Sequence, residues 1–169
     1  MAEVDKILDK DVILNVELKL EYEFNPGTTR GDQLRHIYNV LNGSKRPFFI
    51  SSFDFTTCVM AKQHGVASVV YLMHSWKWDD FRGYLDFMNY ETVMKEIDLA
   101  RQIGLDALMF SKSSFDKWSE EEREELMAYS DKVRSGKEHG PQVSLYGIKD
   151  TDENQYDRFP ITVVDFYNK

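Results

Sequence analysis

The sequence has few cysteines, less basic than acidic charge, and no long apolar run. Cys58 is the only cysteine, which excludes an intramolecular disulfide and a zinc site built from several cysteines. Lys and Arg together number 21, against 29 Asp and Glu, so the formal net charge is -8. An acidic chain has no general attraction for nucleic acid or for an anionic membrane surface. We therefore expect no nucleic-acid partner.

Several kinds of segment are also missing. The first residues, MAEVDKILDKD, mix charges and lack the long apolar run of a signal peptide or a membrane span, so we expect no transmembrane segment and a cytoplasmic location. No glycine-rich phosphate loop or nucleophile elbow is present. No Pro-rich or Gly/Ser-rich linker interrupts the chain. With 169 residues, 42% of them hydrophobic, the sequence predicts a single domain spanning residues 1–169.

Strand-like and helical segments alternate along the chain. Apolar and β-branched runs predict six strands, and apolar residues at helical spacing predict the helices between them. The predicted strands are 12–22, 47–54, 67–76, 105–111, 142–148 and 160–167, and the predicted helices are 28–43, 55–65, 90–104 and 119–136. Because parallel strands need crossover connections, this alternation indicates a mainly parallel α/β sheet.

Six strands are too few for a closed (β/α)8 barrel, which has eight strands and about 250 residues. In parallel sheets, functional side chains gather at the carboxyl ends of the strands. The polar or aromatic residues at the predicted ends are Glu17, Lys19, the residues from Ser51 to Asp54, those from His74 to Trp78, Ser111, those from Tyr146 to Asp150, and Asp165.

Glu17 and Lys19 share one face of the first predicted strand, because side chains two apart in a strand point the same way. One interpretation is a solvated face of an edge strand with a weak ion pair. The other is the interior or mouth of a barrel, where a carboxylate can hold a hard cation and an ammonium can hold a phosphate oxygen. Alternation alone does not decide between them.

The other candidates also have two interpretations. Asp54 either caps the helix that follows or lines a substrate pocket together with Phe53. Tyr146 and Asp165 are candidates for the same pocket, and for Asp165 a local hydrogen-bonding role is equally open. His74 has no second histidine at metal-binding spacing, which favours a structural role or simple exposure over metal binding.

Two segments resemble a known family. The stretch ILNVELK is similar to a strand in the middle of the glycerophosphodiester phosphodiesterase barrel, of the form Asn-(apolar)-Glu-(apolar)-Lys. The stretch FFISSFDFTTCVMAKQ is similar to the next strand and helix of that family, where Ser-Phe-(Asp/Asn) precedes the helix. Weaker similarities follow in order, so that the resemblance covers residues 12–168.

The resemblance implies a partial (β/α)8 barrel of the TIM type, comprising about the last five to six strands. It also implies a hydrolase of lipid metabolism that splits glycerophosphodiesters into glycerol 3-phosphate and an alcohol. Carried over to this chain, Glu17 would be a ligand of a divalent cation, Ca or Mg, and Lys19 would contact the phosphate.

The chain departs from the family pattern in its catalytic residues. The family's first strand carries His-Arg-Gly, which occurs nowhere here, and its second strand supplies a Glu-x-Asp pair of metal ligands. The first strand-like segment of this chain already corresponds to the family's fourth strand. None of the four histidines matches a catalytic position. We therefore expect a truncated barrel with an incomplete metal site and no activity of its own.

Two alternatives belong to other functional classes. Five or six parallel strands in this length also suit a flavodoxin-like domain that binds a ligand or a protein without catalysis. The open edge of an incomplete barrel could instead pair with another chain, and self-association through that edge is an expected consequence.

Overall fold

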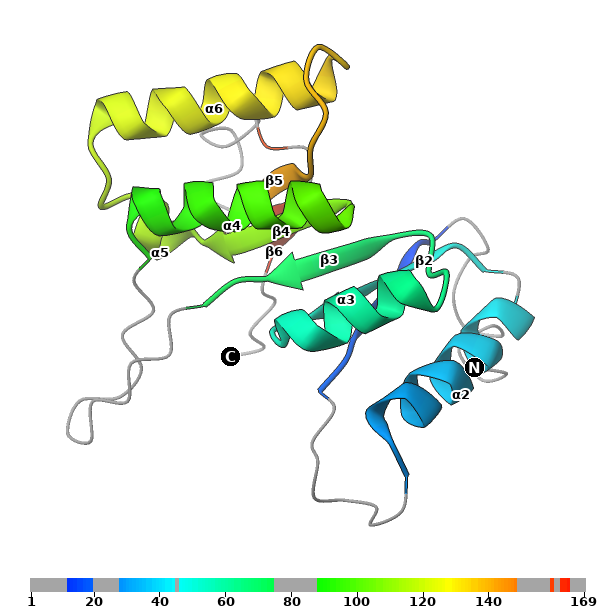
Figure 1. The fold of residues 1–169 in the computed structure, drawn as a ribbon. Helices are drawn as coiled ribbons and strands as arrows, with labels where there is room; N and C mark the ends of the chain where they lie inside the picture. Colours follow the sequence, from blue (N-terminus) through cyan, green and yellow to red (C-terminus); the bar gives the residue numbers. More distant parts are fainter. Residues whose placement is uncertain are drawn as a thin grey trace, which may run out of the picture. The chain divides into compact units, whose positions relative to one another are not determined.

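The computed structural model describes residues 12–19, 28–44, 46–74, 88–148, 159 and 162–164. The chain forms two compact units, Met1–Tyr71 and Leu72–Lys169. In both units parallel strands alternate with helices (Figure 1), so the predicted α/β class is confirmed. That the chain is a single domain stays a prediction.

The described residues of the first unit form two helices and three strands. The elements are β1 (Leu14–Glu17), α2 (Arg30–Gly43), β2 (Phe48–Ser52), α3 (Phe55–Gln63) and β3 (Val69–Leu72), whose last residue begins the second unit. β1 pairs with β2, and β2 pairs with β3, all in parallel. The register places Glu17 beside Ser51, and Ser52 beside Tyr71. The carboxyl ends of β1 and β2 therefore lie together.

The two described helices of the first unit, α2 and α3, cover the same face of its strands. Tyr38 of α2 contacts Phe48 with 6.4 Å between ring centroids, and Phe55 of α3 contacts Tyr71 at 5.1 Å. Phe48 and Ser52 are four residues apart on β2, so they share a face, and Tyr71 is the register partner of Ser52. Because register partners in a sheet point the same way, Phe48 and Tyr71 lie on one face. Asn15, Glu17 and Ser51 belong to the opposite face. The predicted ion pair therefore lies on the face that these two helices leave uncovered.

The second unit also combines helices with parallel strands. Its elements are α4 (Tyr90–Ile103), β4 (Ala107–Ser111), α5 (Lys112–Phe115), α6 (Glu120–Arg134), β5 (Gln142–Ile148) and β6 (Thr162–Val164). β5 pairs in parallel with both β4 and β6, and the pairing shifts by one residue between Tyr146 and Ile148. Gly147 sits at this shift with φ 75°, a conformation that suits glycine.

Aromatic rings form the centre of the second unit. Trp118 stacks on Phe110 of β4 at 5.1 Å and meets Tyr90 of α4 edge-on at 5.5 Å. The indole N–H of Trp118 donates to the carbonyl of Met88 at 2.8 Å, so this buried ring also satisfies its polar atom. Trp118 thereby ties the segment before α6 to the start of α4.

Capping residues set several helix starts. Thr29 with Asp32 forms a capping box at α2, and Ser119 with Glu122 forms one at α6. In each box the side chain of the first residue accepts from the backbone N–H of the second, and the side chain of the second accepts from the backbone N–H of the first. Gly104 ends α4 in the left-handed conformation at φ 71°. The Ser119–Glu122 box confirms the start predicted from the sequence.

The strand order separates two of the sequence-based alternatives. In a flavodoxin-like sheet the first strand lies between the second and the third. Here β2 lies between β1 and β3, and β5 lies between β4 and β6. Within each unit, neighbours in the chain are neighbours in the sheet, which does not fit the flavodoxin-like order.

Candidate functional site

Glu17 and Lys19 form an ion pair at the carboxyl end of β1. The Lys19 Nζ lies 3.2 Å from Glu17 Oε1. The Lys19 side chain is 75% exposed and that of Glu17 is 35% exposed, so water screens the attraction and the pair contributes little to stability. Exposure also leaves both head groups accessible to a dissolved ligand. The structure brings these two predicted site residues together.

Asn15 and Ser51 lie beside Glu17 on the same face of the strands. The Ser51 hydroxyl is buried and donates to Asn15 Oδ1 at 2.7 Å. Asn15 and Glu17 are two residues apart on β1, and Ser51 is the register partner of Glu17. We call Asn15, Glu17, Lys19 and Ser51 the β1 polar face. It combines a cation, an anion, an amide and a hydroxyl at neighbouring strand ends.

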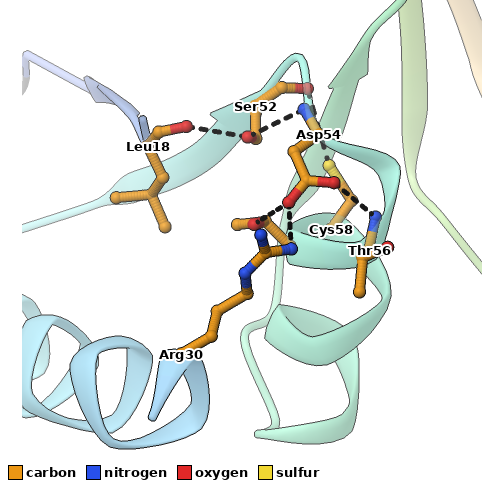
Figure 2. A network of polar contacts seen from close by, with 7 residues as sticks. Leu18, Arg30, Ser52, Asp54, Thr56 and Cys58 are labelled. Carbon is orange, nitrogen blue, oxygen red and sulfur yellow. Dashed lines mark hydrogen bonds and ion pairs between the residues drawn. The ribbon is translucent and has the colours of Figure 1, made fainter. Parts of the chain in front are cut away.

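A second set of contacts lies on the other side of the same strand ends. The backbone N–H of Leu18 donates to the carbonyl of Ser51 at 2.7 Å, and the carbonyl of Leu18 accepts from the Ser52 hydroxyl at 2.7 Å. The Ser52 hydroxyl also accepts from the backbone N–H of Asp54 at 3.2 Å. Figure 2 shows how this hydroxyl links the end of β1 to the start of α3.

Asp54 is the N-cap of α3. Its Oδ1 accepts from the backbone N–H of Thr56 at 3.2 Å, and its Oδ2 accepts from the Thr57 hydroxyl at 2.6 Å and from the guanidinium of Arg30. Figure 2 shows Arg30 and Thr56 converging on the carboxylate. Of the two interpretations of Asp54, the capping role is the one that the structure describes. Phe53 lies half-buried just before it.

Cys58 lies beside this network, and its thiol is unreactive. The thiol is fully buried, with Sγ 3.6 Å from the Ser52 carbonyl and 3.7 Å from the Val70 carbonyl. Burial, together with the charge of Asp54, raises the pKa of Cys58 to about 12. Because the thiolate is the reactive form of cysteine, Cys58 is not a candidate nucleophile.

The candidates of the second unit do not form a comparable cluster. The Tyr146 hydroxyl donates to the carbonyl of Met73 at 2.9 Å, so it ties β5 to the segment after β3. Ser111 caps α5, and its hydroxyl lies 2.9 Å from that of Ser114. His74 follows β3 and is half-buried. Asp165 and the segment with Trp76 and Trp78 lie outside the described residues.

Two further features bear on function. Within the described ranges, no group of three or more His, Cys, Asp or Glu side chains is placed to hold a metal ion. No helix in the same ranges is long and apolar enough to cross a membrane.

The sequence matches no protein-family model, and no curated protein matches it. The resemblance to glycerophosphodiester phosphodiesterases therefore rests on the quoted segments alone.

Sequence reasoning missed Arg30 as part of this region. Its guanidinium contacts Asp54 although 24 residues separate the two in the chain. The side chain of Arg30 is only 12% exposed, whereas that of Asp54 is 39% exposed. Nothing in the spacing of Arg30 within TTRGDQ distinguishes it from a surface arginine. The approach of α2 to α3 creates the contact.

Proposed function

We propose that the chain is the carboxyl-terminal part of a glycerophosphodiester phosphodiesterase-like barrel, and that its β1 polar face binds the phosphate of the substrate. Lys19 contacts a phosphate oxygen in this proposal, and Glu17 is one ligand of a divalent cation. The observation that carries the proposal is the ion pair of Glu17 and Lys19 at a strand end, on the face opposite the helices.

The strand order supports a barrel of this type. In a (β/α)8 barrel every strand pairs with the next one in the chain, and the helices lie outside. The described strands of each unit have that order, and the two described helices of the first unit contact the same face. The β1 polar face would then point into the barrel at the end where such enzymes carry their active sites.

The chemistry of the face suits a phosphate ester. An ammonium group stabilises negative charge on phosphoryl oxygens, and the hydroxyl and amide groups of Ser51 and Asn15 add hydrogen-bonding capacity beside it. The net charge of -8 gives a phosphate no general attraction to the chain, so binding requires a local cation. Lys19 provides one with an exposed head group.

The described residues do not fit a complete cation site. Glu17 is a single carboxylate with an ammonium 3.2 Å away, and Ca²⁺ or Mg²⁺ requires several oxygen ligands. A cation here needs ligands beyond these residues. We therefore assign no step of hydrolysis to this chain alone. With no histidine at a catalytic position, purified protein should not hydrolyse glycerophosphocholine, with or without added Ca²⁺ or Mg²⁺.

The test is a titration of ¹⁵N-labelled protein with glycerol 3-phosphate in the presence of a chelator. We expect amide signals of Lys19 and Ser51 to shift. Lys19→Met should abolish the shifts, because it removes the ammonium and keeps the apolar stem. Glu17→Gln should tighten binding about twofold, because it removes the carboxylate that competes with phosphate for Lys19.

A matched control is Lys95→Met, which removes an exposed lysine from α4 of the second unit. It should leave the titration unchanged. The proposal is wrong if wild-type protein shows no response at Lys19, or if Lys95→Met weakens binding as much as Lys19→Met does.

A further inference from the structure

The regular hydrogen bonding between β1 and β2 ends at Leu18, the residue after β1. Its N–H still bonds to the Ser51 carbonyl, but its carbonyl accepts from a side chain, the Ser52 hydroxyl, at 2.7 Å. In a regular parallel ladder this carbonyl would accept from a backbone N–H of the neighbouring strand. Leu18 is only 6% exposed and Ser52 is fully buried, so water does not readily replace the hydroxyl.

The Leu18 carbonyl belongs to the peptide group that joins Leu18 to Lys19. Because a peptide group is planar, fixing its oxygen also fixes the N–H of Lys19. Rotation of this plane changes φ of Lys19 and swings its side chain. The Ser52 hydroxyl therefore constrains the direction in which Lys19 leaves the strand, although Ser52 lies on the opposite face of the sheet from Glu17.

The Ser52 hydroxyl is itself held from a second side. It accepts from the Asp54 N–H at 3.2 Å, and the Asp54 carboxylate is anchored by Arg30 and by the Thr57 hydroxyl. The chain of contacts thus runs from α2 through the α3 cap to the end of β1 (Figure 2). Each link comes from a different segment, so the end of β1 is fixed by tertiary contacts rather than by its own short ladder.

We infer that Ser52 is a positioning residue that orients Lys19 for phosphate. This inference rests on the proposed function for the ligand, but the orientation of the Leu18–Lys19 peptide is measurable without one. Ser52 does not touch phosphate; it acts through the Leu18 carbonyl. Ser52 is the serine of the Ser-Phe-Asp segment that carries the resemblance, but neither that resemblance nor the exposed ion pair assigns it a role.

The experiment compares wild type with Ser52→Ala by NMR at a temperature where both are fully folded. Without ligand, Ser52→Ala should shift the Leu18 carbonyl carbon and the Lys19 amide, and should speed hydrogen exchange at Leu18. The affinity of Ser52→Ala for glycerol 3-phosphate should be about tenfold lower than that of wild type, because loss of the buried hydrogen bond releases the Leu18–Lys19 peptide from its orientation. Ser52→Cys keeps a weaker donor of similar shape and should give an intermediate effect if Ser52→Ala does not fold.

Ser130→Ala is the matched control. Ser130 is also a buried serine, on α6, but its hydroxyl has no hydrogen-bond partner in the part of the chain that the structure describes. It should change neither the Leu18 and Lys19 signals nor the affinity. If the Ser52 variants leave those signals at wild-type positions, the positioning role is wrong. If the signals move but wild-type protein does not bind glycerol 3-phosphate, the positioning role stands and the proposed function fails.

Discussion

At the scale of single residues, Cys58 offers a clean prediction. Its thiol is fully buried, and its pKa of about 12 leaves roughly one part in ten thousand as thiolate at pH 8. Iodoacetamide should therefore not label native protein over hours at this pH, and should label it fully in urea. Mass spectrometry after quenching measures both. Stoichiometric labelling of native protein within minutes would show that the first unit opens around Cys58.

The raised pKa of Cys58 also makes the stability of the folded state depend on pH. The folded state retains the Cys58 proton at pH values where the unfolded chain, with an ordinary thiol pKa near 9.0, has lost it. The stabilisation from the protonated thiol is therefore fully present below about pH 9 and is lost as the pH rises towards 12. Cys58 thus contributes to loss of stability in alkali.

Single residues also show where sequence reasoning reaches its limit. Glu17 and Lys19 were predictable as a pair on one face, because alternation depends only on spacing along a strand. The roles of Arg30 and Ser52 were not, because each depends on a partner from another element. Asp54 had two interpretations in the sequence, and only the position of α3 shows it as a cap.

At the scale of elements, Asp54→Ala should destabilise the start of α3. It removes the side chain that accepts from the Thr56 N–H and from Arg30. Loss of an N-cap costs about 1 kcal/mol, and loss of the partly buried ion pair adds to it, so we expect the free energy of unfolding in urea to fall by about 2 kcal/mol. Asp54→Asn should cost less, because its amide oxygen still accepts from Thr56.

The matched control for this prediction is Asp131→Ala. Asp131 pairs with Arg134 at 2.7 Å, and its side chain is 38% exposed, against 39% for Asp54. Because Asp131 lies near the end of α6 and caps no helix start, its loss should cost less than about 0.5 kcal/mol. If both variants lowered the free energy of unfolding equally, the Asp54 contacts would stabilise the protein no more than an ordinary surface ion pair.

Most elements were predictable from the sequence, and the differences have physical causes. All six of the described strands and four of the described helices fall within the predicted segments, because apolar periodicity and capping residues are local signals. β1 ends at Glu17, before the end of its apolar run, and the Leu18 carbonyl turns to Ser52 there. α5, from Lys112 to Phe115, was not predicted, because a single turn has no periodic pattern.

At the scale of the whole molecule, we expect self-association through β1. Among the described residues, β2 is the only strand that pairs with β1, and Val12 and Ile13 just before it are 41% and 62% exposed. A strand edge with apolar neighbours invites pairing with another chain. Size-exclusion chromatography with light scattering should show an apparent mass that rises with concentration above 19.9 kDa.

A charge introduced beside β1 should reduce self-association. Ile13→Lys should shift the protein towards monomer, whereas Leu99→Lys, which changes an exposed leucine on α4 of the second unit, should not. A wild-type protein that stays monomeric at every concentration would exclude association through β1.

The sequential strand order described for each unit has a consequence for how the chain folds. Each ladder within the described part of the two units joins strands that are consecutive in the chain, so each closure encloses only one connection. Loop closure costs more entropy as the enclosed segment lengthens, and folding slows as contacts become more distant in sequence. A sheet in this order can grow by one strand and its connection at a time, including during synthesis, without waiting for a distant strand to arrive.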